Sequence, residues 1–305
     1  MDCNFLEKIF GWDRMRRLFQ VLIRIVLIVA GFLFIFNLPS LLGIGKNHIE
    51  IKFKTFWVNL TSDFQLLLHS NQDKQLEIFE KLHMAESYQY TMTILLCSLL
   101  FIIFLAMITA ILILLSPEKV KNKLKSGINF FEAVPDLLII FLFQFFVITL
   151  YKSTGLKFLQ LYGLFGHKPY FVPIMTVSFL PFFLLLQFLI KIIDEEQYQQ
   201  YVLYAKAKGM GRLRTLLVHI MRNIFPLLIF QLRTIVWVLL SNIFLVEILF
   251  NISGFNQQLF KIIFMDGEFS VLVMCLLMLS IPLVIIETVG WFISKLIKGK
   301  ETVSI

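Results

Sequence analysis

Apolar residues along the chain fall into six long blocks separated by polar stretches. Each block has about the 20 residues that a helix needs to cross a bilayer. Within hydrocarbon, a single segment satisfies its own backbone groups only as a helix. The pattern therefore predicts an all-α integral membrane protein with six transmembrane helices, at Val21–Leu42, Tyr90–Leu115, Phe130–Tyr151, Phe171–Ile193, Ile224–Phe250 and Ser270–Ile297.

Basic residues orient these helices. Lys and Arg cluster before the first block, between the second and third, between the fourth and fifth, and after the sixth. Loops on the cytoplasmic side of a membrane carry such an excess. These stretches alternate along the chain, so we expect all of them to be cytoplasmic, together with both termini.

The polar stretches also divide the chain into parts. The outer segment mixes Lys with Asp and Glu, and the apolar spacing of Ile51–Leu68 and Leu76–Leu82 predicts two short helices there. The first block is too long for the apolar core of a signal peptide, so we expect it to be retained. The expected parts are a cytoplasmic N-terminus with the first helix at 1–42, an extracytoplasmic segment at 43–89, the main transmembrane domain at 90–297, and a tail at 298–305.

Composition weakens other classes of protein. Hydrophobic residues make up 58% of the chain and charged residues 16%, too few for the surface of a soluble domain. The net charge of +8 would suggest a nucleic-acid partner in a soluble protein. Here the basic residues flank apolar blocks, so we expect lipid and no nucleic acid as a partner. The three Cys and five His form no disulfide or ligand pattern, so no metal or cofactor is expected.

A few polar residues stand within the apolar blocks. Arg233, Asn242 and Glu247 lie in the fifth block, where a charge is costly unless it meets a partner or water. They are candidates for the translocation path or for contact with a partner subunit. The alternative, which we favour for the two charges, is that Arg233 reaches the cytoplasmic boundary and Glu247 the outer one. Gln144 and Gln187 are candidates for hydrogen bonds between helices.

The stretch between the fourth and fifth blocks has the pattern of a helical hairpin. Tyr198, Tyr201, Val202 and Ala205 follow helical spacing, after three acids that suit a helix N-terminus. Gly209 is placed to end this helix. A second short helix follows, with Leu213, Leu216, Leu217, Ile220 and Met221 on one face, and Pro226 marks the start of the fifth span. From physics alone, the hairpin either protrudes into the cytoplasm or lies on anionic headgroups.

The same residues carry a family resemblance. The run YVLYAKAKGM at 201–210, then LLVH at 216–219 and Arg222-Asn223 before Pro226, resembles the EAA loop of ABC-importer permeases. The match is closest to the oligopeptide, dipeptide and nickel branch. Downstream, VEILF at 246–250 and SGF at 253–255 are similar to the VETVF…PGLG segment of that branch. The resemblance covers roughly residues 88–297 and differs from the branch in having few glycines in the second and fifth helices.

The resemblance implies a type I ABC-importer permease fold in the bacterial plasma membrane. It implies a coupling loop at 194–223 that docks on a partner ATPase. It further implies two cytoplasmic ABC ATPases, a second permease that is a homologue, and an extracytoplasmic solute-binding protein. The cargo would be an oligopeptide or a similar small solute. The residues that would dock on the ATPase are Tyr201, Tyr204, Ala205, Lys206, Ala207, Lys208, Gly209 and Arg212.

Other functions make different demands on the sequence. The chain contains no GxxxxGK[ST] phosphate-binding loop, so we expect ATP hydrolysis on separate subunits and no enzyme activity here. A secondary transporter working alone is the main alternative, but such proteins often show repeated halves, and no convincing repeat is present. A membrane-embedded enzyme would need a nucleophile–base pair or metal ligands within the bundle.

Overall fold

The computed structural model describes residues 29–44, 49–68, 79–155, 168–263 and 269–301, together with 19, 23, 26, 27 and 77. Nearly all of these residues are helical, which confirms the all-α prediction. A shorter apolar helix at Val29–Leu41 belongs to the first predicted span, most of whose earlier part lies outside the described residues. Five helical segments are long and apolar enough to cross a membrane: Met84–Leu115 (α4), Asp136–Thr154 (α6), Phe171–Glu196 (α7), Arg212–Leu249, and Val271–Gly290 within α12 (Phe269–Glu301).

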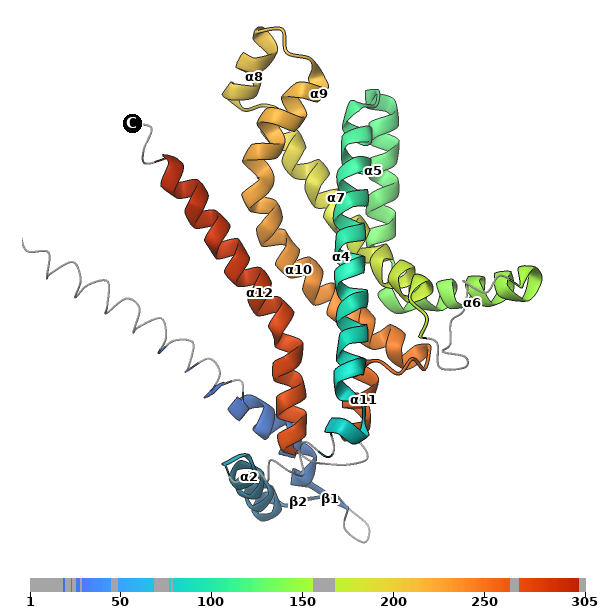
Figure 1. The fold of residues 1–305 in the computed structure, drawn as a ribbon, viewed down its shortest axis with the longest axis vertical. Helices are drawn as coiled ribbons and strands as arrows, with labels where there is room; N and C mark the ends of the chain where they lie inside the picture. Colours follow the sequence, from blue (N-terminus) through green and yellow to red (C-terminus); the bar gives the residue numbers. More distant parts are fainter. Residues whose placement is uncertain are drawn as a thin grey trace, which may run out of the picture. The chain divides into compact units, whose positions relative to one another are not determined.

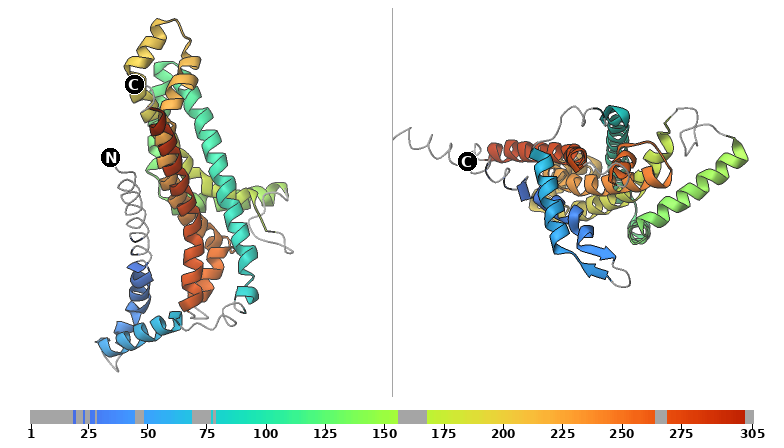
Figure 2. Two further views of the ribbon diagram at one scale, coloured as in Figure 1. Left: turned by 60° about the vertical axis from the view of Figure 1, so that its left-hand side comes forward. Right: turned by 90° about the horizontal axis from the view of Figure 1, so that it is seen from below.

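The chain divides into two compact units, of which the smaller comprises residues 1–79 and 265–276. After a 3₁₀ turn (Leu38–Leu41), β1 (Leu42–Ile44) pairs antiparallel with β2 (Ile49–Ile51), as Figure 2 shows, and α2 (Phe53–Leu68) follows. The buried amide of Asn37 donates to Asp63 at 2.9 Å, which ties α2 to the preceding helix. The helix predicted at Ile51–Leu68 is confirmed as α2, whereas the strand pair was not predicted. The second predicted helix, Leu76–Leu82, lies partly outside the described residues.

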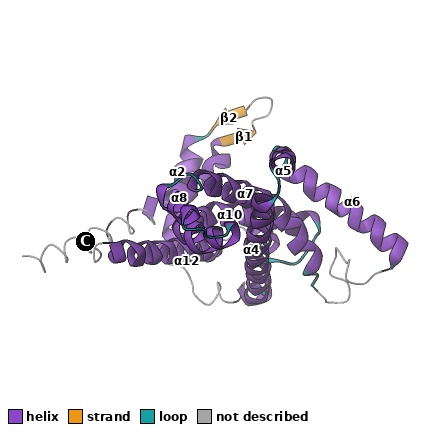
Figure 3. Ribbon diagram, turned by 90° about the horizontal axis from the view of Figure 1, so that it is seen from above, coloured by secondary structure: helices purple, strands orange, loops and turns teal. Residues whose placement is uncertain are grey.

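The core of the larger unit is built by α4, α7 and α10 (Met221–Leu249), which pack on one another. Figures 1 and 3 show these three helices side by side. Ala106 and Ala110 of α4 are fully buried, so the small face predicted for close helix approach does face the core. Leu185, Leu189 and Leu239 fill the same core from α7 and α10.

The polar connection after α4 differs from the prediction. It forms a 15-residue amphipathic helix, α5 (Glu118–Glu132), which ends just before Pro135. Proline disfavours helical backbone in the residue before it, so α5 ends at Glu132 with Ala133 as its C-cap, and Pro135 caps the start of α6. The third span therefore begins at Asp136, and the predicted start at Phe130 is wrong.

Candidate functional site

The hairpin predicted between the fourth and fifth spans is present at one end of the bundle (Figure 1). It consists of α8 (Gln200–Ala207), α9 (Arg212–Arg214) and a π-helical segment (Thr215–Ile220) that continues directly into α10. Pro226, predicted to mark the start of the fifth span, lies inside a helix that already begins at Met221 and runs through it. Proline is tolerated inside membrane helices when neighbouring groups satisfy the freed backbone.

Gly209 makes the turn of the hairpin. Its φ of +78° is in the left-handed region, where a residue with a Cβ is strained. The amide of Met210 bonds back to the carbonyl of Ala205 at 3.3 Å, and that of Gly209 to the carbonyl of Lys206 at 3.0 Å. These bonds close the last turn of α8, so the predicted role of Gly209 as a helix end is confirmed.

A small apolar interface holds the two arms of the hairpin together. Val202 and Ala205 of α8 are buried, and α8 packs on the π-helical segment, where Leu216 and Ile220 are buried. The predicted apolar faces are only partly right, since Leu213 and Leu217 are exposed. The π-helical segment holds more residues per turn than an α-helix, which shifts the register that α-helical spacing predicts.

The outer surface of the hairpin is apolar and basic. Its exposed large hydrophobic side chains include Tyr198, Leu203, Tyr204, Leu213, Leu217 and Val218. Lys206, Lys208 and Arg212 are exposed beside them, and the Lys208 ammonium lies 4.6 Å from the centre of the Tyr204 ring. Clustered exposed apolar groups are typical of interaction sites. This set of nine side chains is called the hairpin tip below.

The base of the hairpin is joined by Glu196, the last residue of α7. Its Oε1 accepts a hydrogen bond of 2.6 Å from the Tyr201 hydroxyl and another from the Asn223 amide. Partial burial and the bond to Glu196 both raise the pKa of Tyr201, so it stays a neutral donor. One carboxylate thereby connects the ends of α7, α8 and α10.

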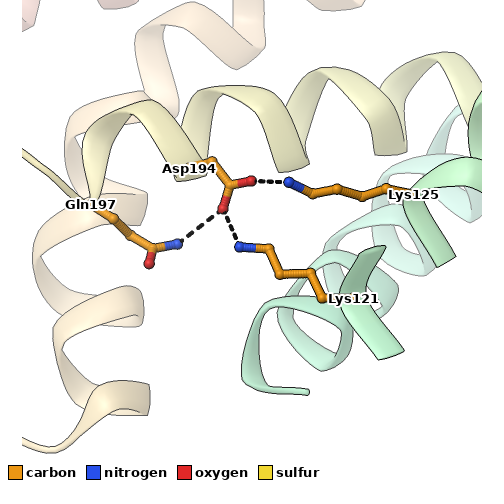
Figure 4. A network of polar contacts seen from close by, with 4 residues as sticks. All are labelled: Lys121, Lys125, Asp194 and Gln197. Carbon is orange, nitrogen blue, oxygen red and sulfur yellow. Dashed lines mark hydrogen bonds and ion pairs between the residues drawn. The ribbon is translucent and has the colours of Figure 1, made fainter. Parts of the chain in front are cut away.

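Asp194 makes a second connection at the base, shown in Figure 4. Its carboxylate pairs with Lys121 at 2.6 Å and with Lys125, both on α5, and accepts a bond of 3.3 Å from Gln197. The acids were expected at the start of α8, but they end α7, where the helix dipole disfavours them. Lys121 and Lys125 offset the unfavourable position of the Asp194 charge at the C-terminal end of α7. Their spacing of four residues on one helix face is the signal that sequence reasoning overlooked.

A different carboxylate organises the opposite end of α10. Glu247 is 1% exposed and accepts hydrogen bonds from Thr91 of α4 at 2.5 Å and from the amides of Asn256 and Gln257 at 2.8 and 3.3 Å. These amides begin α11 (Phe255–Lys261), whose N-terminus favours a negative charge. A Cβ on Gly254 would overlap the carboxylate. Glu247 therefore meets its partners inside the protein, and its place at the outer membrane boundary stays a prediction.

The other polar residues singled out in the fifth span are not gathered at one place. Arg233 lies 3.9 Å from Glu287 of α12, and both side chains are more than half exposed. Asn242 is buried, and its Oδ1 has no hydrogen-bond partner among the described residues. The predicted interhelical bond of Gln187 is present, since its amide donates to Asn129 of α5 at 3.1 Å.

Similarity to known proteins covers most of this larger unit. The family described as binding-protein-dependent transport system inner membrane component matches residues 102–298. The chain is 21% identical over 154 residues to the metal-staphylopine import system permease protein CntB from two strains of Staphylococcus aureus. The aligned region is 50% of this chain and 49% of each relative, so it spans about half the length of the curated relatives.

Proposed function

Because the chain belongs to the family of inner membrane components of binding-protein-dependent transport systems, we propose that it is a permease subunit of an ATP-driven ABC importer. Members of this family are transport subunits and not enzymes. The proposed assembly contains two cytoplasmic ATPases, a second, homologous permease and an extracytoplasmic solute-binding protein. In this assembly the hairpin, residues 194–223, lies in the cytoplasm.

The observation that carries the proposal is the combination of an exposed hairpin tip and a fixed base. The tip presents exposed apolar and basic groups, among which the Lys208 ammonium lies over the Tyr204 ring of the same tip, as expected of a surface that fits into a groove on another subunit. Tyr204, Lys206, Lys208 and Arg212 would contact the ATPase directly. Ala205 is buried beneath the tip and Gly209 makes its turn, so both would set the shape of the tip.

The base explains how movement of an ATPase would reach the membrane. Glu196 joins α8 to α10, and Asp194 joins the end of α7 to α5. A short helix fixed in this way moves as one body with the helices behind it. Closure of the two ATPases would therefore shift α5, α7 and α10 together and change which side of the membrane the permease opens to.

The cargo is proposed to be a small polar solute of the peptide-like class. The staphylococcal relative is named for import of metal–staphylopine, and the resemblance in the hairpin is to the oligopeptide, dipeptide and nickel branch. Peptides and metal chelates both carry several carboxylate, amine or amide groups. An oligopeptide or a metal chelate of similar size is the cargo that fits both similarities.

The docking role is tested by replacing exposed apolar residues at this end of the bundle with a charge. Tyr204→Asp changes the hairpin tip, and Val120→Asp changes another exposed apolar site, on α5, as a control. The tagged permease is purified with its ATPases, and ATP-dependent uptake is measured in proteoliposomes. We expect Tyr204→Asp to lose the ATPases and uptake while Val120→Asp retains both. Full ATPase retention by Tyr204→Asp and by Leu203→Asp would contradict the proposal.

A further inference from the structure

A polar cavity of about 560 Å³ opens between α5, α7 and α10 near the base of the hairpin. Three amide side chains line it, namely Asn129 of α5, Gln187 of α7 and Gln231 of α10. Lys125, Lys191, Asp194 and Glu195 complete its polar wall, while apolar residues such as Ile128 and Phe188 form the remainder. The cavity thus combines two cations, two anions and three neutral amides.

These polar groups are placed at two depths. Asp194 and Glu195 lie near the end of α7, whereas Gln187 lies seven residues earlier, about 10 Å deeper at 1.5 Å per residue. Gln231 is ten residues into α10, about 15 Å from its start at the same rise. Polar groups inside a membrane bundle are costly unless they meet water or a partner, and they commonly mark solute pathways.

A second cavity in the same unit has an almost entirely apolar lining, so a polar lining is not a general property of cavities in this bundle. It measures about 330 Å³, lies between α4, α6 and α7, and is lined by Phe, Leu, Val and Met with Ser178 as its sole polar residue. A site that serves only packing or lipid would resemble this one. The amides at 129, 187 and 231 therefore point to a polar occupant of the first cavity.

The charges indicate what kind of polar occupant fits. Asp194 is paired with Lys121 and Lys125, which leaves Lys191 and Glu195 as the lining charges outside that cluster. They stand four residues apart on α7, so they lie on one face of the helix. The Gln187–Asn129 bond uses one donor and one acceptor, and each amide retains further capacity for a ligand. A nucleotide or phosphate would meet as many anions as cations here.

We propose that this cavity binds a small zwitterionic solute, with its carboxylate at Lys191, its ammonium group at Glu195 and its amide or hydroxyl groups at Asn129, Gln187 and Gln231. The inference rests on the proposed function and deepens it: the cavity is a cytoplasmic-side cargo site within one permease, occupied as the solute leaves. Cargo that accumulates in the cytoplasm would reoccupy it and slow further import.

The test uses the complete permease–ATPase complex in nanodiscs without nucleotide. The probes are trialanine and alanopine, two zwitterions of peptide and opine type, together with N-acetyl-trialanine amide, which lacks both charges. Binding is measured by equilibrium dialysis of labelled probe. We expect at least one zwitterion to bind and the blocked peptide to bind on the order of tenfold more weakly, since each lost bond to a charged group is worth at least that factor.

Variants assign the binding to this cavity. Gln187→Leu and Lys191→Gln are expected to weaken zwitterion binding on the order of tenfold, whereas Ser178→Ala in the apolar cavity is expected to leave it unchanged. Lys191 is exposed, so its replacement is compatible with folding even if that of Gln187 is not. If the complex retains its ATPases but binds neither zwitterion, or if both variants bind like the unmodified protein, the cavity proposal fails alone. If no ATPase is retained, the proposed function fails, and this inference with it.

Discussion

Both ends of the bundle are held by a carboxylate, but the two carboxylates are held in opposite ways. At the hairpin end, the side chain of Asp194 is 23% exposed and pairs with two lysine ammonium groups on long flexible stems. At the other end, Glu247 is buried and accepts hydrogen bonds from a threonine hydroxyl and two backbone amides. Salt or a charged partner should weaken the ion pairs of Asp194, whereas the hydrogen bonds of Glu247 depend on the packing of the helices around it.

The difference matches what each end is proposed to do. The hairpin transmits movement through links that hold as it docks, and these partly buried ion pairs adjust more readily than the buried hydrogen bonds at the other end. The end of α10 joins α4 and α11 through one carboxylate whose loss would leave several buried donors without an acceptor. We infer that these three helices move as a single body while the hairpin end changes its contacts.

The largest effect is expected from Glu247→Ala. The change leaves the Thr91 hydroxyl and the amides of Asn256 and Gln257 without their acceptor, which costs roughly 3–5 kcal/mol of unfolding free energy. Reversible unfolding in mixed detergent micelles, followed by tryptophan fluorescence, measures the loss. Glu195→Ala is the control, because its exposed side chain should change stability by no more than about 0.5 kcal/mol. Equal losses in the two variants would remove the contrast between the ends.

A steric change at the same place should have the next largest effect. In Gly254→Ala the new methyl group meets the Glu247 carboxylate, and displacing it should cost about 1–3 kcal/mol. Gly127→Ala on α5 has open space around it and should instead stabilise the protein by about 1 kcal/mol, as expected inside a helix. The sign of the change in unfolding midpoint distinguishes the two. A neutral Gly254→Ala would show that the carboxylate is not tightly placed.

The sequence predicts the helices and the turn at these two ends, but not the contacts between them. The spans α4, α7 and α10 follow from hydropathy alone, because a bilayer-length apolar run has few alternatives. The turn at Gly209 follows from the local rule that a left-handed residue ends a helix. Tertiary partners do not follow from such rules. Thr91 is 156 positions from Glu247 and Lys121 is 73 from Asp194, so neither pairing is visible before the helices are packed.

Two local features escaped prediction for different reasons. The helix α5 is rich in Lys, and its high charge favours a polar loop over the helix that its few apolar residues support. The π-helical segment at Thr215–Ile220 shifts the apolar face, an effect that spacing rules for α-helices do not include. Neither feature affects the family resemblance of the hairpin, because that resemblance depends on the order of its residues and not on the helix face that each one occupies.

A substitution at the turn of the hairpin tests the docking role of the tip without altering the contacts at its base. Gly209→Ala places a Cβ at φ +78°, which should cost about 1–2 kcal/mol locally although no neighbour is near. ATP-dependent uptake should fall more than the unfolding midpoint, because the strain is confined to the docking surface. Gly209→Asn should restore part of the uptake, since Asn tolerates this backbone. An alanine variant with unimpaired uptake would mean that the shape of the turn is not used in docking.

The smallest expected effect is that of Asp194→Asn, which removes the charge that holds α5 to α7. Exposed ion pairs contribute about 0–1 kcal/mol each, and these two pairs are partly buried, so the unfolding free energy should fall by about 1–2 kcal/mol for the two pairs at low salt. In about 1 M salt, where the Debye length is about 3 Å, the difference from the unmodified protein should largely vanish. A double-mutant cycle with Lys121→Met isolates the pair. If the loss exceeded that of Glu247→Ala, or persisted undiminished in salt, the Asp194 anchor would be as rigid as the Glu247 anchor, and the proposed difference between the two ends would not hold.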